Sequence, residues 1–305
     1  MKKARQGDFL SKPSSIVLFG SLRQEIMFDT LIKNHDPAAE SQNRFTITGG
    51  AMRTIRFLLC LLLLLALPAS VMGLPMFGVE GAVGVWRPSP DGKLKTGSDD
   101  EIDLKRDLSL GRETELMGRI KVDMPLMIPN TYLTANPLKM SDTTRSAFDF
   151  GGKQFNDGGT TDLLNTELKL NQYDFGLFYS VPFLSAATLN RLNVDAGLNF
   201  RYIDAEASVS GGGSSASESM SIVIPQVYLG AQFQPVERFS FEAEARGVTY
   251  RDDSSYSLLG RVRANAFGPV FVSGGYRYDE YDIDRGGLVL DFNFSGPFVE
   301  TGFSF

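Results

Sequence analysis

Residues 190–203 read NRLNVDAGLNFRYI, and this stretch decides the fold. Every second residue from Leu192 to Tyr202 is apolar or aromatic, whereas the residues between them, from Asn193 to Arg201, are polar or glycine. A period of two that separates an apolar face from a polar face is typical of a β-strand. Residues 239–250 and 256–266 repeat the pattern. The chain is therefore predicted to be all-β.

Three features favour an antiparallel, up-and-down transmembrane β-barrel over a soluble sandwich, which also alternates. The candidate strands are about 11 to 14 residues long, as a strand tilted across a bilayer requires, whereas soluble strands are shorter. The chain ends in Gly302-Phe303-Ser304-Phe305, and its alternating Phe303 and Phe305 resemble the C-terminal assembly signal of bacterial outer-membrane barrels. Aromatic residues also lie at strand ends on the apolar face, where interfacial girdles place them: Tyr202, Phe233, Phe239, Tyr250, Tyr256, Tyr276 and Tyr278.

The strand count is predicted to be ten, or eight if 125–165 form one long excursion. An even number returns both termini to the periplasmic side. The connections 125–129, 183–189, 235–236 and 268–269 are short, whereas 88–112, 137–165 and 207–218 are long and polar, as external loops should be. A bulge is predicted near Gly296-Pro297, because proline cannot donate in a ladder. The candidate strands are 76–87, 113–124, 130–136, 166–182, 190–206, 219–234, 237–251, 255–267, 269–283 and 286–305.

The N-terminal region contains an export signal that begins late. Residues 57–67 (FLLCLLLLLAL) are uninterruptedly apolar, follow Arg53 and Arg56, and precede small residues that end at Gly73. This is the pattern of a signal peptide and is too short for a membrane-spanning helix. We expect a signal peptide at 52–73, a barrel at 74–305, and a spurious or disordered extension at 1–51.

Composition then restricts the chemistry of the mature chain. The single Cys60 and the single His35 both precede residue 74, so the barrel segment contains neither residue type. That excludes zinc sites of the Cys/His type, disulfides and triads with an imidazole base, and no cofactor is expected. Removing nine basic and five acidic residues with the first 73 leaves 21 and 31, a net charge of about −10. Such an acidic protein is a poor candidate for nucleic-acid binding.

Four stretches carry a family resemblance. They are Gly78-Val79-Glu80-Gly81-Ala82-Val83-Gly84-Val85-Trp86, residues 128–133 (IPNTYL), residues 148–152 (FDFGG) and residues 274–278 (GGYRY). In these the chain is similar to small bacterial outer-membrane β-barrel proteins with a Gly-Gly motif. The resemblance implies the barrel fold and a location in the cell outer membrane. It implies no catalytic residues.

The polar faces of the strands should line the lumen if the apolar faces meet lipid. A ten-stranded barrel is narrow, so we expect charges of opposite sign to pair and occlude it. The alternative is a narrow channel in which arginines attract small anionic solutes. The predicted lumen residues are Glu80, Glu115, Arg119, Lys121, Asp174, Asp195, Asn199, Arg201, Gln226, Gln232, Glu242, Glu244, Arg246, Arg261, Arg263, Arg277, Asp279, Asp291 and Glu300.

No enzymatic activity is expected. Paired carboxylates such as Glu242 and Glu244 have arginines beside them, which favours ion pairing over a proton shared for acid–base catalysis. Acidic runs at 99–107 and 279–284 are expected in external loops, as solvated charge or as weak cation sites that bridge lipopolysaccharide. Trp86 is expected to anchor the first strand at the outer interface. The predicted partners are outer-membrane lipid, lipopolysaccharide and the barrel assembly machinery, with a monomeric protein as the functional unit.

Overall fold

The chain divides into two compact units, Met1–Leu65 and Ala66–Phe305, and every described residue belongs to the second. The computed structural model describes residues 77–96, 101–125, 128–156, 161–181, 183–189, 191–251, 253–285 and 288–305. The predicted extension at 1–51 and the predicted signal peptide at 52–73 lie outside the described residues.

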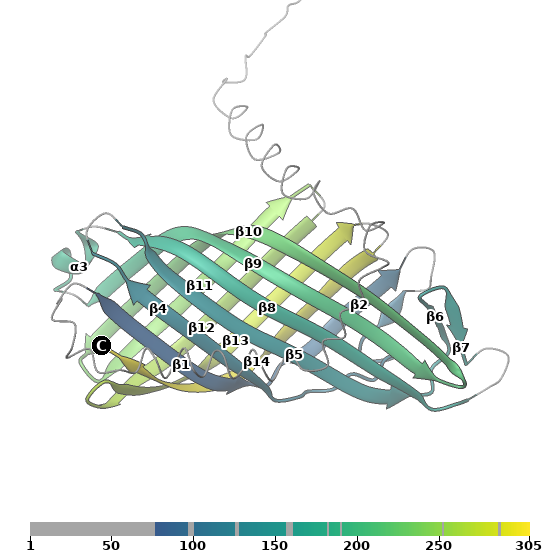
Figure 1. Ribbon diagram of the computed structural model, residues 1–305. Helices are drawn as coiled ribbons and strands as arrows, with labels where there is room; N and C mark the ends of the chain where they lie inside the picture. The colour runs from purple at the N-terminus through teal and green to yellow at the C-terminus, as the bar shows by residue number, and fades with distance from the viewer. Residues whose placement is uncertain are drawn as a thin grey trace, which may run out of the picture. The chain divides into compact units, whose positions relative to one another are not determined.

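Ten antiparallel strands form a closed barrel (Figure 1), and the prediction of ten strands is confirmed. Each strand pairs with its neighbours in chain order, and the first strand closes the sheet on the last, with Val83 opposite Thr301. The strands are β1 (Gly78–Trp86), β4 (Glu115–Asp123), β5 (Asn130–Thr144), β8 (Leu164–Ser180), β9 (Leu192–Gly211), β10 (Ser214–Val236), β11 (Phe239–Tyr250), β12 (Asp253–Phe267), β13 (Val270–Arg285) and β14 (Leu288–Ser304).

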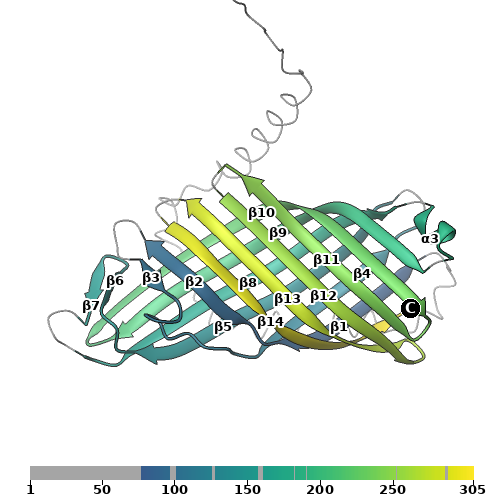
Figure 2. The same ribbon diagram turned by 180° about the vertical axis from the view of Figure 1, so that it is seen from behind.

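Smaller elements occupy the predicted connections. β2 (Ser89–Thr96) follows β1 along the same side of β14, as Figure 2 shows, and β3 (Ile102–Asp103) pairs with β2. A hairpin of β6 (Phe148–Phe150) and β7 (Lys153–Phe155) lies in the loop after β5, and the short helix α3 (Leu184–Ala187) lies between β8 and β9. We call the half of the barrel that holds Gly78 and Ser304 the proximal half, and the half that holds the β9–β10 turn the distal half.

β5 is longer than the predicted 130–136 because Pro137 does not end it. β4 pairs with β5 only as far as Ala135, and among the described residues no strand pairs with that side of β5 beyond this point. The Lys139 and Ser141 N–H groups point to the same open side, where they donate to the side chains of Glu115 and Glu113. Pro137 alternates with Lys139 and Ser141, so its backbone nitrogen also points to the open side and its missing N–H removes no hydrogen bond to β8.

The polarity of the two faces reverses partway along the strands. On the outer face of β9, apolar residues run from Val194 to Tyr202, and Asp204 and Glu206 follow them. On its inner face the order is opposite, because polar residues run to Arg201, which is fully buried, and Ile203 begins an apolar row. The proximal half is therefore apolar outside and charged inside. The distal half is polar outside and apolar inside, like a soluble β-protein.

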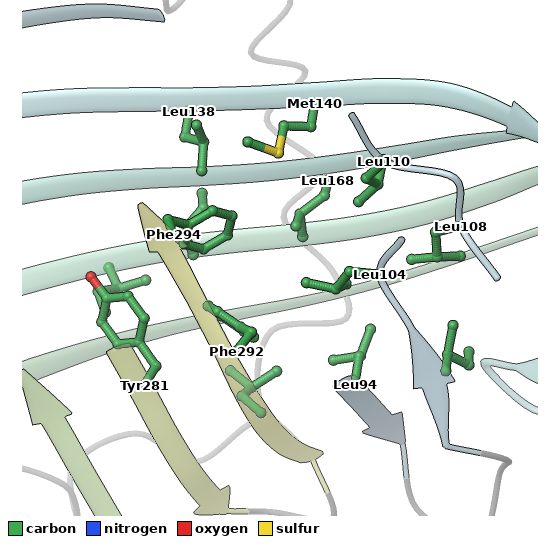
Figure 3. Close-up of a cluster of buried hydrophobic side chains, with 14 of the residues drawn as sticks. Leu94, Leu104, Leu108, Leu110, Leu138, Met140, Leu168, Tyr281, Phe292 and Phe294 are labelled. Carbon is green, nitrogen blue, oxygen red and sulfur yellow. The ribbon is translucent and has the colours of Figure 1, made fainter. Parts of the chain in front are cut away.

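A cluster of buried hydrophobic side chains fills the distal half (Figure 3). Strand residues such as Met140 and Phe294, both 0% exposed, meet Leu104, Leu108 and Leu110 from the loop between β3 and β4. Thr166 Oγ1 donates to the Leu108 carbonyl at 2.8 Å and fixes the loop to β8. The loop between β1 and β4 thus folds into the barrel and plugs its distal half.

Two expectations for the last strand are wrong. β13 and β14 pair without a register shift from Val270 to Arg285, so there is no bulge at Gly296-Pro297. The bulge was inferred to keep Phe292 and Phe294 on the lipid face, but both point into the distal apolar cluster. By the same alternation Asp291 is exposed on the outer face and not in the lumen.

We expect Phe294→Ala to lower the free energy of unfolding by about 3 to 5 kcal/mol, because it leaves a cavity in a packed cluster. Asp291→Asn on the same strand should change it by less than about 0.5 kcal/mol, since that side chain is exposed. Urea unfolding followed through Trp86, the single tryptophan and 2% exposed, measures both. Equal effects of the two substitutions would contradict the inward placement of Phe294.

Candidate functional site

The candidate site is a layer of paired charges inside the proximal half, which we call the ion-pair layer. Its members come from eight strands, and on each strand they occupy alternate positions whose side chains point into the barrel. The layer contains seven basic and seven acidic side chains, so its formal charges balance. They are Arg119, Lys121, Arg201, Arg246, Arg261, Arg263 and Arg277, and Glu80, Asp174, Asp195, Glu242, Glu244, Asp279 and Glu300.

One part of the layer lies nearest the proximal end and is built around Arg119 and Glu80. Arg119 pairs with Glu80 and, at 3.0 Å, with Glu300 across the β1–β14 closure. Glu80 also pairs with Arg263, whose guanidinium lies 3.8 Å from the centre of the Phe271 ring. These contacts connect the first and last strands to β4 and β12, so ion pairs reinforce the closure of the sheet.

Arg261 extends this part of the layer to β11. It pairs with both Glu242 and Glu244, and Glu244 also pairs with Arg246. Each carboxylate therefore faces at least one guanidinium, as buried charges require. Glu242 and Glu244 do not form a carboxylate pair that shares a proton, because an arginine separates them.

The other part of the layer, around Arg201, is the most deeply buried. Arg201 Nε and Nη2 donate to the two Asp174 oxygens at 2.7 and 3.0 Å, in the bidentate geometry that suits a guanidinium. Its Nη1 donates to the Tyr281 hydroxyl at 2.9 Å and lies 3.5 Å from Asp279. Arg201, Asp174 and Asp279 are each at most 2% exposed. This part of the layer lies at the boundary with the apolar cluster.

A hydrogen-bonded chain of neutral side chains connects the two parts. Asn199 donates to Asp174 at 2.9 Å and accepts from the Tyr132 hydroxyl at 2.6 Å, and Arg246 donates to that hydroxyl at 2.9 Å. Arg246 also lies over the rings of Tyr132 and Tyr228. The interior is thus one continuous polar network. A cavity of about 70 Å³ beside Lys121, Asp195 and Tyr132 offers room for a few water molecules.

Of the nineteen predicted lumen residues, Asp291 lies on the outer face, Glu115 accepts from the Lys139 N–H at the open side of β5, and the charges of the ion-pair layer lie in the interior. The structure also places inside aromatic residues that were not predicted to face the lumen, among them Trp86, Tyr132, Phe178, Tyr228 and Tyr281. Trp86 is not at the outer interface. Its indole donates to the Gly296 carbonyl at 3.3 Å, and Arg277 lies 4.6 Å above its ring. The sequence did indicate this position, because Trp86 lies an even number of residues after Glu80 on the same strand and therefore shares its inward face.

The acidic runs are arranged differently from the expected solvated loops. In the first, Asp103 accepts from the backbone of Lys105 and Arg106, and a hydrogen bond from Arg106 lowers the pKa of Asp107. The second lies on β13, where Glu280, Asp282 and Asp284 are exposed on the outer face and Asp279 is buried in the ion-pair layer. Residues 99–100 lie outside the described residues. No metal-binding group of His, Cys, Asp or Glu occurs among the residues that the structure describes.

No protein-family model matches the sequence, and no curated protein matches it either. Solved structures with similar strand layouts include Ail, the attachment invasion locus protein of Yersinia pestis, at 10% identity and a TM-score of 0.37 over 75% of this chain and 99% of that one. The translocator domain of the autotransporter NalP from Neisseria meningitidis matches at 12% and 0.39 over 83% and 97%. The toluene transporter TodX of P. putida matches at 10% and 0.25 over 78% and 92%. At these TM-scores no function and no equivalent residue is transferred.

Within the described residues, no helix is long and apolar enough to span a bilayer.

We expect Asp174→Asn to destabilise the barrel by about 3 to 5 kcal/mol, because it leaves the buried Arg201 without its bidentate partner. The matched control is Asp91→Asn, which removes an exposed ion pair with Lys105 and should cost less than about 1 kcal/mol. Urea unfolding followed through Trp86 measures both. If the double variant D174N/R201M recovers none of the loss, the uncompensated charge is not the cause.

Proposed function

We propose that this chain is an outer-membrane β-barrel with a sealed lumen, which acts at the cell surface through its distal half. The observation that carries the proposal is the presence of two different seals in series. The balanced ion-pair layer fills the proximal half, and the apolar cluster with the inserted loop fills the distal half. A solute that follows the axis would have to break buried ion pairs and then displace Leu104, Leu108 and Leu110.

The outer face supports the location in a membrane. In the proximal half it presents large apolar side chains to the surroundings, such as Leu198 at 55% and Val227 at 56% exposed. Exposed aromatic residues lie at both limits of this band, including Tyr202 and Tyr256 on one side and Phe239 and Phe267 on the other. Water would make this surface costly, whereas lipid would not. We therefore orient the proximal end to the periplasm and the distal half to the medium.

The C-terminal aromatic residues support insertion by the barrel assembly machinery. Phe303 and Phe305 point outward, at 49% and 57% exposed, on the strand that closes the barrel. Their exposure leaves the C-terminal aromatic residues available for recognition before closure. Lipopolysaccharide remains the proposed neighbour of the polar outer rows above the apolar band.

A narrow channel for small polar or anionic solutes is the competing function, and the polar cavity beside Lys121 favours it. The balance of seven basic and seven acidic side chains opposes it, because no excess positive charge is left to attract an anion.

Planar-bilayer recordings of the folded protein should show no discrete conductance steps, because both seals are closed. Discrete steps whose ion selectivity shifts in Arg263→Ala would overturn the sealed barrel and support the channel. Arg191→Ala, a substitution at the proximal rim outside the ion-pair layer, serves as the matched control for selectivity.

Single-cysteine labelling tests both the location and the distal seal, since the barrel segment contains no native cysteine. On intact cells a membrane-impermeant maleimide should label Ser217→Cys, which is exposed on β10, and should not label Leu168→Cys, which is 6% exposed. Rapid labelling of Leu168→Cys would show an open distal half. No labelling at Ser217→Cys would contradict the proposed orientation.

A further inference from the structure

β10 extends well beyond its neighbour on one side. It has 23 residues, and β11 has 12. β9 accompanies β10 along almost its whole length, from Ser214 to Phe233, but pairing with β11 begins only at Val227. In the described part of the chain, no strand pairs with the other side of β10 between Ser214 and Gln226. The distal half therefore has an open sheet edge.

The β9–β10 turn determines which backbone groups point to that edge. Gly212 and Gly213 have φ values of 59° and 79°, which suits a two-residue type I′ hairpin in which Ser214 N–H donates to the Gly211 carbonyl. Hydrogen-bonded pairs then alternate, so even-numbered residues bond to β9 and odd-numbered residues face the open side. Lys153 Nζ donates to the Ser215 carbonyl from the neighbouring hairpin, which agrees with this parity. Ser217, Ser219 and Ser221 thus present unpaired backbone groups.

Protection of the open edge is confined to Pro225, which has no N–H on the open side, and to the inward-pointing Glu218; between Ser215 and Ser221 the outward row carries neither a charge nor a proline. Charges, prolines and bulges normally block pairing with another chain, but the outward side chains here are Ser215, Ser217, Ser219 and Ser221, all exposed. The open part of β5 in the same barrel is different. There the carboxylates of Glu115 and Glu113, two residues apart, accept from the N–H groups of Lys139 and Ser141 at 3.0 Å each. At β5 two carboxylates block the open edge, whereas at β10 Lys153 reaches the Ser215 carbonyl and the serines that follow keep exposed side chains.

An apolar recess lies behind the free edge. A cavity of about 30 Å³ has a lining that includes Glu218, Ser219 and Met220 of β10 together with apolar residues such as Leu168, Leu290 and Phe292. Ala216, Glu218, Met220 and Ile222 form the inner row of the edge, and the three apolar members are half-buried against the apolar cluster. A strand added beside β10 would direct every second side chain toward this recess.

The outer surroundings of the edge are acidic. Asp204 lies opposite Ser221 and accepts from its hydroxyl at 3.1 Å. On the other side of the opening, the outer row of β13 carries Glu280 and Asp282. Burial and the neighbouring carboxylates, Asp291 and Asp253 foremost, raise the pKa of Asp282, which shows how crowded the negative charge is. Outward side chains on an added strand would be favoured if they were basic.

We propose that residues 215–221 of β10 form a strand-addition site for an extended cationic segment of a surface polypeptide, with apolar residues at alternate positions. Backbone hydrogen bonds to Ser217, Ser219 and Ser221 hold the segment. Its apolar side chains pack beside Met220 and Ile222, and its basic side chains face Asp204 and Asp282. The site deepens the proposed surface function and rests on it, because the edge must face the medium.

The test uses Ser219→Pro in the full folded protein. Proline removes an N–H that faces the open side and keeps the bonds to β9, and edge positions tolerate it. The probe is a labelled peptide of about seven alternating lysine and valine residues, which matches the length of the edge, and binding is measured by fluorescence anisotropy. We expect saturable binding to the wild type and at least about tenfold weaker binding to Ser219→Pro, given the lost hydrogen bond and the blocked approach. Ser219→Thr, which keeps the N–H, should bind as the wild type does.

Equal binding by the wild type and Ser219→Pro, or no saturable binding to the wild type, would overturn the strand-addition site. Tighter binding of a glutamate–valine peptide would do the same, because it contradicts the acidic surroundings. An unchanged Trp86 fluorescence shows that Ser219→Pro is folded. These failures differ from failure of the sealed barrel, which conductance and cysteine labelling report independently of any peptide.

Discussion

The structure depends on one constraint: the same strands must be stable beside two different surroundings. In the proximal half the outer face is apolar, so the polar side chains of each alternation fall inside and must find partners there. In the distal half the outer face is polar, and the same alternation directs apolar side chains inward. The change occurs within single strands, at Arg201 and Ile203 on β9 and at Gln172 and Leu170 on β8. The ion-pair layer and the apolar cluster are therefore two consequences of one pattern.

Arg201 has its structural role because it lies at this change. A guanidinium next to an apolar cluster loses its water on one side, so its remaining donors have to be satisfied by the protein. Asp174, Asp279 and the Tyr281 hydroxyl supply acceptors around it. The neutral chain through Asn199 and Tyr132 connects this group to Arg246. The charges thus specify how the strands register in three dimensions, whereas the leucines and phenylalanines supply most of the buried apolar area.

The barrel fold and many of the residues that face its interior could be predicted from the sequence. Alternation alone places Glu80, Arg119 and Arg261 on inward faces, and turn lengths separate the two ends of the barrel. The errors share one physical cause, which is the assumption that the apolar face of a strand stays outside along its whole length. That assumption put Asp291 in the lumen and required a bulge at Gly296-Pro297. The inserted loop could not be predicted from the sequence for another reason. Leu104, Leu108 and Leu110 do not follow the alternation of a β-strand, and they become buried only through tertiary packing.

Unequal strand lengths explain why the distal half has edges at all. A barrel abolishes edges only where every strand continues, and here β4 and β11 end early while β5 and β10 continue. At β5 the spacing of Glu113 and Glu115 matches the spacing of two strand N–H groups, so two side chains replace part of a missing strand. At β10 the equivalent backbone groups belong to serines, with an apolar recess behind them and acidic residues beside them. Since one chain contains both arrangements, the exposed serine edge of β10 is not a general property of the fold. It is a local property of β10, and the proposed strand-addition site rests on it.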